Sequence, residues 1–156
     1  LAERARAARM PVIYVNDNFG RWRSDFQTTL DYVLRDTPGR KLAETLRPHD
    51  TDYFVLKPKH SGFFATALDI LLSYLDAQWL ILTGISGDIC VLFTAHDAHM
   101  RDYGLIVPED CVASTSSREN QHALAMMRAT LRADTTPSDK LDLGRYLDPE
   151  HRSPRT

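Results

Sequence analysis

Short apolar stretches alternate with amphipathic stretches along this chain. Mostly apolar residues run together at positions 11–15, 52–56, 79–83 and 105–107, and a polar residue, a glycine or a proline follows each run. The stretches between these runs are long enough for helices. Short strands that alternate with helices are typical of an α/β domain with a parallel sheet.

The intervening stretches predict helices by their spacing. Leu68, Leu71, Leu72 and Leu75 recur at the positions that share one helix face, and Thr66 with Asp69 resembles a capping box before them. Further helices are predicted at residues 1–9, 26–35, 41–46, 88–101 and 116–132. We expect a single domain over residues 1–156, with residues 133–156 forming a surface tail.

Composition narrows the class of protein. The chain has 156 residues, a net charge of −2 and no basic run, which argues against a nucleic-acid surface. Its apolar runs are too short to cross a membrane. Two cysteines do not form a disulfide framework, so we expect a cytoplasmic protein. We also expect a homo-oligomer that acts on a small molecule.

Cys90 is the most informative candidate for chemistry. It follows an apolar run and a small-residue turn, and it lies in the first turn of a predicted helix. Amide groups at a helix N-terminus favour a thiolate and can hold an oxyanion. Lys57, at the end of a neighbouring strand, is the best partner by position, and Lys59 competes with it. The alternatives are an inert buried cysteine and a solvated lysine.

Three segments follow strand ends, where ligands collect in open α/β sheets, namely residues 16–20, 57–63 and 84–90. Their candidate substrate-binding residues, with one just beyond the first segment, are Asp17, Asn18, Phe19, Trp22 and His60. An Asx turn is an equal alternative for Asp17, and loop anchoring is one for the aromatic residues. His96 and His99 share a helix face, but we expect packing or exposure there. We expect no metal site and no cofactor.

Taken together, three runs resemble the isochorismatase-like cysteine hydrolase superfamily. They are Val12 to Asp17, Leu56 to Asp69 and Leu82 to Val91, with a Lys-x-x-x-Ser-x-Phe block in the second and a Gly-x-x-x-Asp-x-Cys-Val block in the third. The resemblance covers roughly residues 1–132 in order and spacing. It implies a three-layer αβα, Rossmann-like fold with a mostly parallel central sheet.

The resemblance also implies a catalytic triad of cysteine, lysine and aspartate. Cys90 matches the nucleophile and Lys57 matches the lysine. A cis peptide bond between Ile85 and Ser86 is implied as well, with the backbone amides of Ser86 and Cys90 forming the oxyanion hole. Members usually carry threonine where Gly87 stands, so this chain lacks one hydroxyl group beside the cysteine.

The acid of the triad has no match in this sequence. In the family it ends the first strand, before a helix, whereas this chain begins in that helix. The role is not transferred to Asp17. A missing central strand would leave its neighbours unpaired. We therefore expect an N-terminally incomplete domain, with roughly two dozen or more residues before Leu1, the size of a strand–loop–helix unit.

The cysteine favours hydrolysis of a C–N bond within this superfamily. Hydrolysis of the vinyl ether of isochorismate uses no cysteine, so nicotinamide-like, carbamoyl or ureido substrates are expected. The stretch from Asn16 to Trp22 lacks the Asp-x-His motif of the zinc-binding nicotinamidases. Two rivals stay open: a non-catalytic binding or scaffold protein, and a thiol-redox protein that pairs Cys90 with Cys111.

Overall fold

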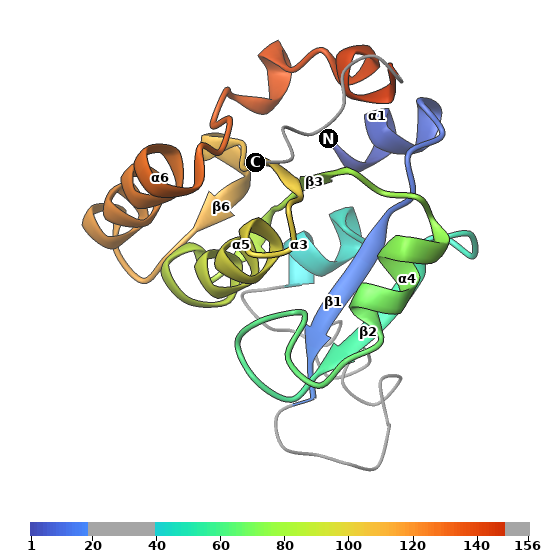
Figure 1. Ribbon diagram of the computed structural model, residues 1–156, viewed down its shortest axis with the longest axis horizontal. Coiled ribbons are helices and arrows are strands. Elements are labelled where there is room, and N and C mark those ends of the chain that lie inside the picture. The colour runs from blue at the N-terminus through green and yellow to red at the C-terminus, as the bar shows by residue number, and fades with distance from the viewer. Residues whose placement is uncertain (19–39, 149–156) are drawn as a thin grey trace.

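A computed structural model describes residues 1–18 and 40–148 of the chain. Strands and helices alternate along it, as the pattern of apolar runs predicts (Figure 1). The predicted helix at residues 26–35, Phe19 and Trp22 all lie outside the described residues. The short helices α1 (Ala2–Ala7) and α3 (Arg40–Thr45) correspond to the helices predicted near these positions.

The strands pair in parallel. Strand β1 (Ile13–Asp17) runs beside β2 (Tyr53–Lys57), β3 (Trp79–Ile81) beside β5 (Gly104–Ile106), and β4 (Gly84–Ile85) beside β6 (Val112–Ala113). The parallel sheet expected from the sequence is thus confirmed. In the register of the first pair, Asp17 lies opposite Lys57. The last residues of both strands therefore meet at one edge of the sheet.

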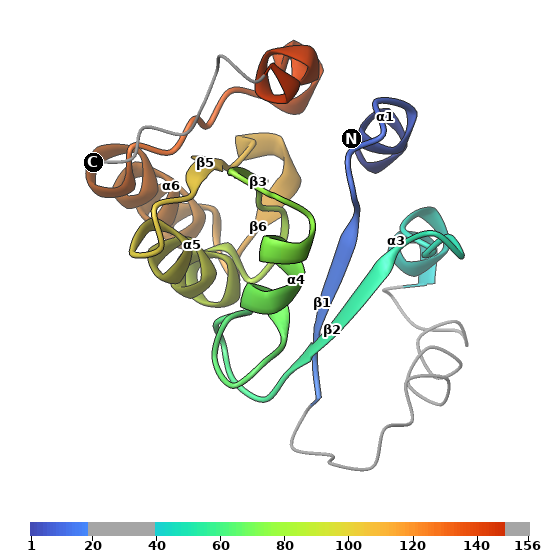
Figure 2. The same ribbon diagram turned by 45° about the vertical axis from the view of Figure 1, so that its right-hand side comes forward.

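The pairs form three separate two-stranded sheets. Figure 2 shows the β1–β2 pair apart from the half of the molecule that holds β3 and β5. The residues of β1 and β3 are all half-buried, whereas the three residues of β5 are fully buried. The centre of the core therefore lies around β5, and β1 joins it through Ile13 and Val15.

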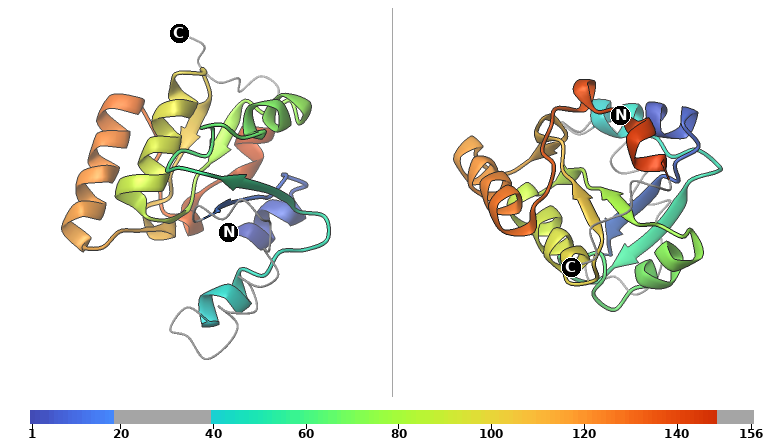
Figure 3. Two further views of the ribbon diagram at one scale, coloured as in Figure 1. Left: turned by 90° about the horizontal axis from the view of Figure 1, so that it is seen from below. Right: turned by 45° about the horizontal axis from the view of Figure 1, so that its top comes forward.

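Helices cover the strands on both sides, in an αβα arrangement. Helix α4 (Leu68–Tyr74) and α3 lie on opposite sides of the β1–β2 pair (Figures 1, 2 and 3). Helix α5 (Leu92–His99) packs against α6 (Ser117–Leu131) and β5. The Ser116 hydroxyl accepts the Glu119 N–H and starts α6, which fits the predicted helix at 116–132.

The expectation of a surface tail from residue 133 is wrong for its first part. Ala133, Leu141 and Leu143 are buried, the last two in a cluster with Ile106. Asp134 forms a parallel bridge to Ile106, and its carbonyl accepts the N–H of Val107. The segment pairs with the end of β5, and its leucines pack against Ile106 of that strand.

Candidate active site

Lys57 ends β2 and carries a buried ammonium group. The residue is 5% exposed. Its Nζ donates to Asp17 Oδ2 at 3.0 Å, to the Lys59 carbonyl at 3.1 Å and to Cys90 Sγ at 3.5 Å. An ammonium has three N–H donors, and here each has an acceptor. The structure thus brings together Lys57 and Cys90, which lie 33 residues apart in the sequence.

Cys90 lies in a π-helical turn, η1 (Gly87–Val91), that leads directly into α5. The Ser86 carbonyl accepts the N–H groups of Ile89 and Val91 and so closes this turn. The sequence predicted a helix from about residue 88 but not its wide first turn. Such turns occur often at functional sites. Cys90 is half-buried and its thiol is not in a disulfide.

The peptide bond between Ile85 and Ser86 is cis, as the family resemblance implied. Ser86 itself is extended, and its hydroxyl donates to the carboxylate of Asp88. This hydrogen bond holds the pKa of Asp88 below its ordinary value. Asp88 is therefore a fixed negative charge in the first turn of the helix.

The packing around position 87 explains why this chain has glycine there. A Cβ atom there would lie 2.6 Å from Asn120 Oδ1 and 3.0 Å from Ser114 Oγ. The Ser114 hydroxyl accepts the Asp88 N–H at 3.0 Å and donates to Asn120 at 2.9 Å. Ser114, which lies between β6 (Val112–Ala113) and α6, thus supplies a hydroxyl group next to η1, where a threonine side chain at position 87 would not fit.

Sequence reasoning missed the ion pair of Asp17 with Lys57. The two residues are 40 positions apart, and Asp17 was only a candidate for substrate binding. The one signal that pointed to it was that both residues end adjacent parallel strands. The Asn18 N–H donates to the Lys57 carbonyl and continues that pairing. Within residues 1–18 and 40–148, Cys90 Sγ has no carboxylate hydrogen-bond partner, and Asp17 reaches it through the ammonium.

The other candidates near the strand ends are placed as follows. The His60 ring lies against Phe93, with ring centroids 5.5 Å apart, and both residues are exposed. Lys59 contributes its backbone carbonyl to Lys57. Between His96 and His99, Asp97 bonds to Ser61. In the part of the chain that is described, no three acidic, histidine or cysteine side chains could hold a metal ion together.

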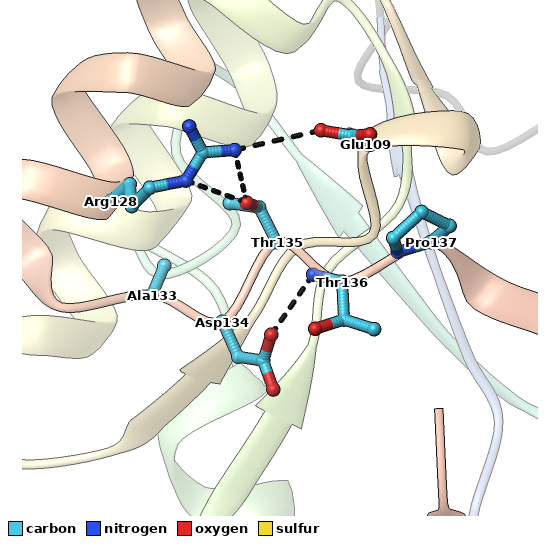
Figure 4. A pocket seen from close by; sticks show the side chains of 7 residues that line it. All are labelled: Glu109, Arg128, Ala133, Asp134, Thr135, Thr136 and Pro137. Atoms are coloured by element: carbon cyan, nitrogen blue, oxygen red, sulfur yellow. Dashed lines mark hydrogen bonds and ion pairs between the residues drawn. The ribbon is translucent and has the colours of Figure 1, made fainter. Parts of the chain in front are cut away.

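A polar pocket lies at a different place, beside the segment that follows α6. Arg128 donates to Thr135 and pairs with Glu109 at 3.5 Å across it (Figure 4). Its lining residues are Glu109, Arg128, Ala133, Asp134, Thr135, Thr136 and Pro137. Neither Cys90 nor Lys57 is among them, so the pocket belongs to another part of the surface.

Comparisons with known proteins identify the family of this chain. An isochorismatase domain matches residues 1–138. The isochorismatase family protein YaaI of Bacillus subtilis is 43% identical over 90% of this chain and 77% of its own length. Ureidoacrylate amidohydrolase RutB of Klebsiella pneumoniae is 39% identical over 70 residues, which are 45% of this chain and 30% of RutB.

Solved structures share the fold. N-carbamoylsarcosine amidase of Thermoplasma acidophilum has a TM-score of 0.71 and 30% identity, over 90% of this chain and 80% of that protein. The nicotinamidase SaPncA of Staphylococcus aureus has a TM-score of 0.67 and 25% identity, over 86% of this chain and 78% of that protein. Because the domain match covers most of the chain and the resemblance to YaaI extends along it, this protein belongs to the isochorismatase family of hydrolases.

Proposed function

We propose that this protein hydrolyses the C–N bond of a small amide, carbamoyl or ureido compound through a Cys90 thioester. The observation that carries the proposal is the contact between the Lys57 ammonium and Cys90 Sγ, at the start of a helix. A buried cation beside a thiol favours the thiolate, which is the nucleophilic form. The names of three similar proteins, an amidase, a nicotinamidase and an amidohydrolase, point to the same kind of bond.

The proposed reaction has two steps. The Cys90 thiolate attacks the carbonyl carbon, and the amides of Ser86 and Cys90 hold the oxyanion that forms. The C–N bond then breaks, and the leaving nitrogen gains the proton that the thiol lost. Water adds to the thioester, the C–S bond breaks, and the acid and the thiol are released. Asp17 keeps the Lys57 ammonium in place throughout.

Turnover by the Cys90→Ala variant tests the proposal. A panel of small amides, ureido acids and carbamoyl amino acids is screened with ammonia detection, using the wild-type protein first. The variant should lose turnover while its far-ultraviolet circular dichroism and its melting temperature stay unchanged. A covalent acyl adduct on Cys90, found by intact-protein mass spectrometry under single turnover, would support the thioester. Retained turnover in Cys90→Ala would refute the scheme.

A binding or scaffold protein of the same fold is the alternative. It is favoured by one observation, namely that no carboxylate bonds directly to Cys90 Sγ among residues 1–18 and 40–148. If the panel shows no turnover and the substrates still bind, as measured by calorimetry, the scaffold function is the better description. A redox role for Cys90 and Cys111 has less support, because the two cysteines lie far apart in the sequence and lack a CxxC spacing.

The wider setting is also proposed. In the described residues no helix is both long and apolar enough to cross a membrane. We propose a cytoplasmic homo-oligomer, because two cysteines do not form a disulfide framework and several large apolar side chains are exposed, among them Ile70 and Tyr74 on α4. Size-exclusion chromatography with light scattering measures the assembly, and a monomer at micromolar concentration would contradict this part.

A further inference from the structure

The loop that follows Lys57 is held against the helix that carries Cys90. We call residues 57–63 the lysine loop. Cys90, Thr94 and Asp97 are spaced by four and three residues, so they share one face of η1 and α5, and Arg101 follows four residues later, in the turn after α5. The last three of them make polar or cation–π contacts that reach the lysine loop or the carboxylate bound to it.

Thr94 makes the most direct of these connections. Its Oγ1 donates to the Cys90 carbonyl at 2.7 Å and accepts the Gly62 N–H at 2.9 Å. One hydroxyl therefore bonds both to the backbone of the nucleophile and to the backbone of the lysine loop. A hydroxyl has one donor and two acceptor sites, so both bonds can persist together.

Asp97 and Arg101 hold the same loop one and two turns further along. The Ser61 hydroxyl, in a residue that is 6% exposed, donates to Asp97 Oδ2 and accepts the Phe63 N–H at 3.1 Å. Arg101 donates to Asp97 Oδ1 at 3.1 Å, and its guanidinium carbon lies 4.6 Å from the centre of the Phe63 ring. The loop is thus fixed by side chains from one face of α5 and from the turn that follows it.

Packing leaves the loop little room to move. A Cβ atom at Gly62 would lie 3.1 Å from both Leu68 Cδ2 and Val15 Cγ1. The Thr66 hydroxyl also donates to the Gly62 carbonyl at 2.5 Å. Because Lys57 Nζ bonds back to the Lys59 carbonyl, the place of the loop backbone determines the place of the ammonium.

We propose that Thr94 is a positioning residue, which sets the Lys57 ammonium against Cys90 Sγ by bonding to Gly62 and Cys90 at once. The proposal rests on the proposed function, in which Cys90 is the nucleophile. Thr94 touches neither the thiol nor the ammonium in this role. It acts through Lys57, by fixing the loop whose Lys59 carbonyl accepts a hydrogen bond from the ammonium.

Alkylation of Cys90 by iodoacetamide tests the proposal without any need for a substrate. Thr94→Val keeps the shape of the side chain and loses the hydroxyl, whereas Thr94→Ser keeps the hydroxyl. The rate is followed across pH by peptide mass spectrometry, with Cys111 as the internal reference. We expect Thr94→Val to slow Cys90 alkylation near neutral pH at least about fivefold, as one lost hydrogen bond allows, and to move its pH profile upward. Thr94→Ser should restore most of the rate.

A double-mutant cycle with Lys57→Met separates positioning from simple stability. If Thr94 acts through the lysine, Thr94→Val should cause no further slowing in the Lys57→Met protein. Slowing of equal size in both backgrounds would overturn the proposal, and so would a lower melting temperature with an unchanged Cys90 profile. If Lys57→Met does not fold, the alkylation rates of Thr94→Val and Thr94→Ser decide whether the Thr94 hydroxyl is needed. A wild-type protein without amide turnover would refute the proposed function and leave these alkylation results valid.

Discussion

Replacing Lys57 by methionine removes the cation beside Cys90 and keeps an unbranched side chain. Nζ lies 3.5 Å from Sγ, and the lysine side chain is only 6% exposed. For unit charges at this separation, an effective dielectric constant of about 20 gives an attraction of about 5 kcal/mol for the thiolate. The charge of Asp17 remains in the variant and adds repulsion.

Solvent reduces this figure, because Cys90 is half-buried and the Asp17 side chain is 30% exposed. We therefore expect a loss of about 3 kcal/mol of thiolate stabilisation, which is roughly a hundredfold in the alkylation rate near pH 7. Turnover of an amide substrate should fall at least as far. Fluorescence and circular dichroism check that the variant folds before the rates are compared.

Lys59→Met is the matched control, since it removes a lysine from the same loop while its backbone carbonyl still faces Lys57. The rate of Cys90 alkylation should change by less than about twofold in this control, because an exposed charge is screened. If Lys57→Met alters the rate no more than Lys59→Met does, the electrostatic reasoning fails. Equal effects would also remove the main support for the proposed nucleophile.

The same electrostatic reasoning predicts that Asp17→Asn does not slow Cys90 alkylation, in contrast to Lys57→Met. The contacts of 3.0 Å and 3.5 Å, laid end to end, place Asp17 Oδ2 within about 6.5 Å of Sγ, where its repulsion of a thiolate is at least about 2.5 kcal/mol before screening. The asparagine keeps an oxygen for Nζ. Cys90 alkylation should therefore stay equal or become faster. A loss like that of Lys57→Met would show that the Asp17 charge is needed to hold the lysine.

Three further predictions concern stability. Gly104→Ala places a Cβ atom 2.3 Å from the Trp79 ring, so it should destabilise by about 1–3 kcal/mol in urea unfolding, and an unchanged midpoint would contradict the packing. Met127→Ala removes a side chain that is 0% exposed and should cost about 2–5 kcal/mol, seen as a lower melting temperature. The Arg6 guanidinium lowers the pKa of Asp52 in the folded state, so this pair adds stability above the ordinary aspartate pKa. That stability should be lost as pH falls through the lowered pKa. In Asp52→Asn, the free energy of unfolding, measured in urea at a series of acidic pH values, should therefore fall less steeply with pH.

Local pattern predicted the elements well. The apolar runs at 52–56 and 105–107 became β2 and β5 within one residue, and the leucine spacing from Leu68 became α4. These signals are local, because side-chain alternation and helical spacing repeat within a few residues. Residues 133–143 were misjudged because Ala133, Leu141 and Leu143 are too widely spaced for any such pattern, although each packs into the core.

The motif around Cys90 was also readable from the sequence. It gave the helix and, through resemblance, the cis bond before Ser86. Residues 84–85, predicted as part of a turn, instead form the short strand β4, because they pair with β6, which was not predicted either. The wide π turn was not predicted, because it begins the helix, and no earlier helical turn sets a spacing that its extra residue could interrupt. The fit of Gly87 against Ser114 and Asn120 was equally hidden, since those residues come from a later element.

The sequence by itself determined four of the six strands in the described residues and most of the helices, and it predicted Cys90 and Lys57 as a reactive pair. Only the tertiary structure decided that Asp17 pairs with Lys57 and that Thr94 ties the lysine loop to the cysteine helix. These contacts join residues 32 to 40 positions apart. Such pairs leave no periodic trace in a chain, because they arise where parallel strands end together and a helix packs across them.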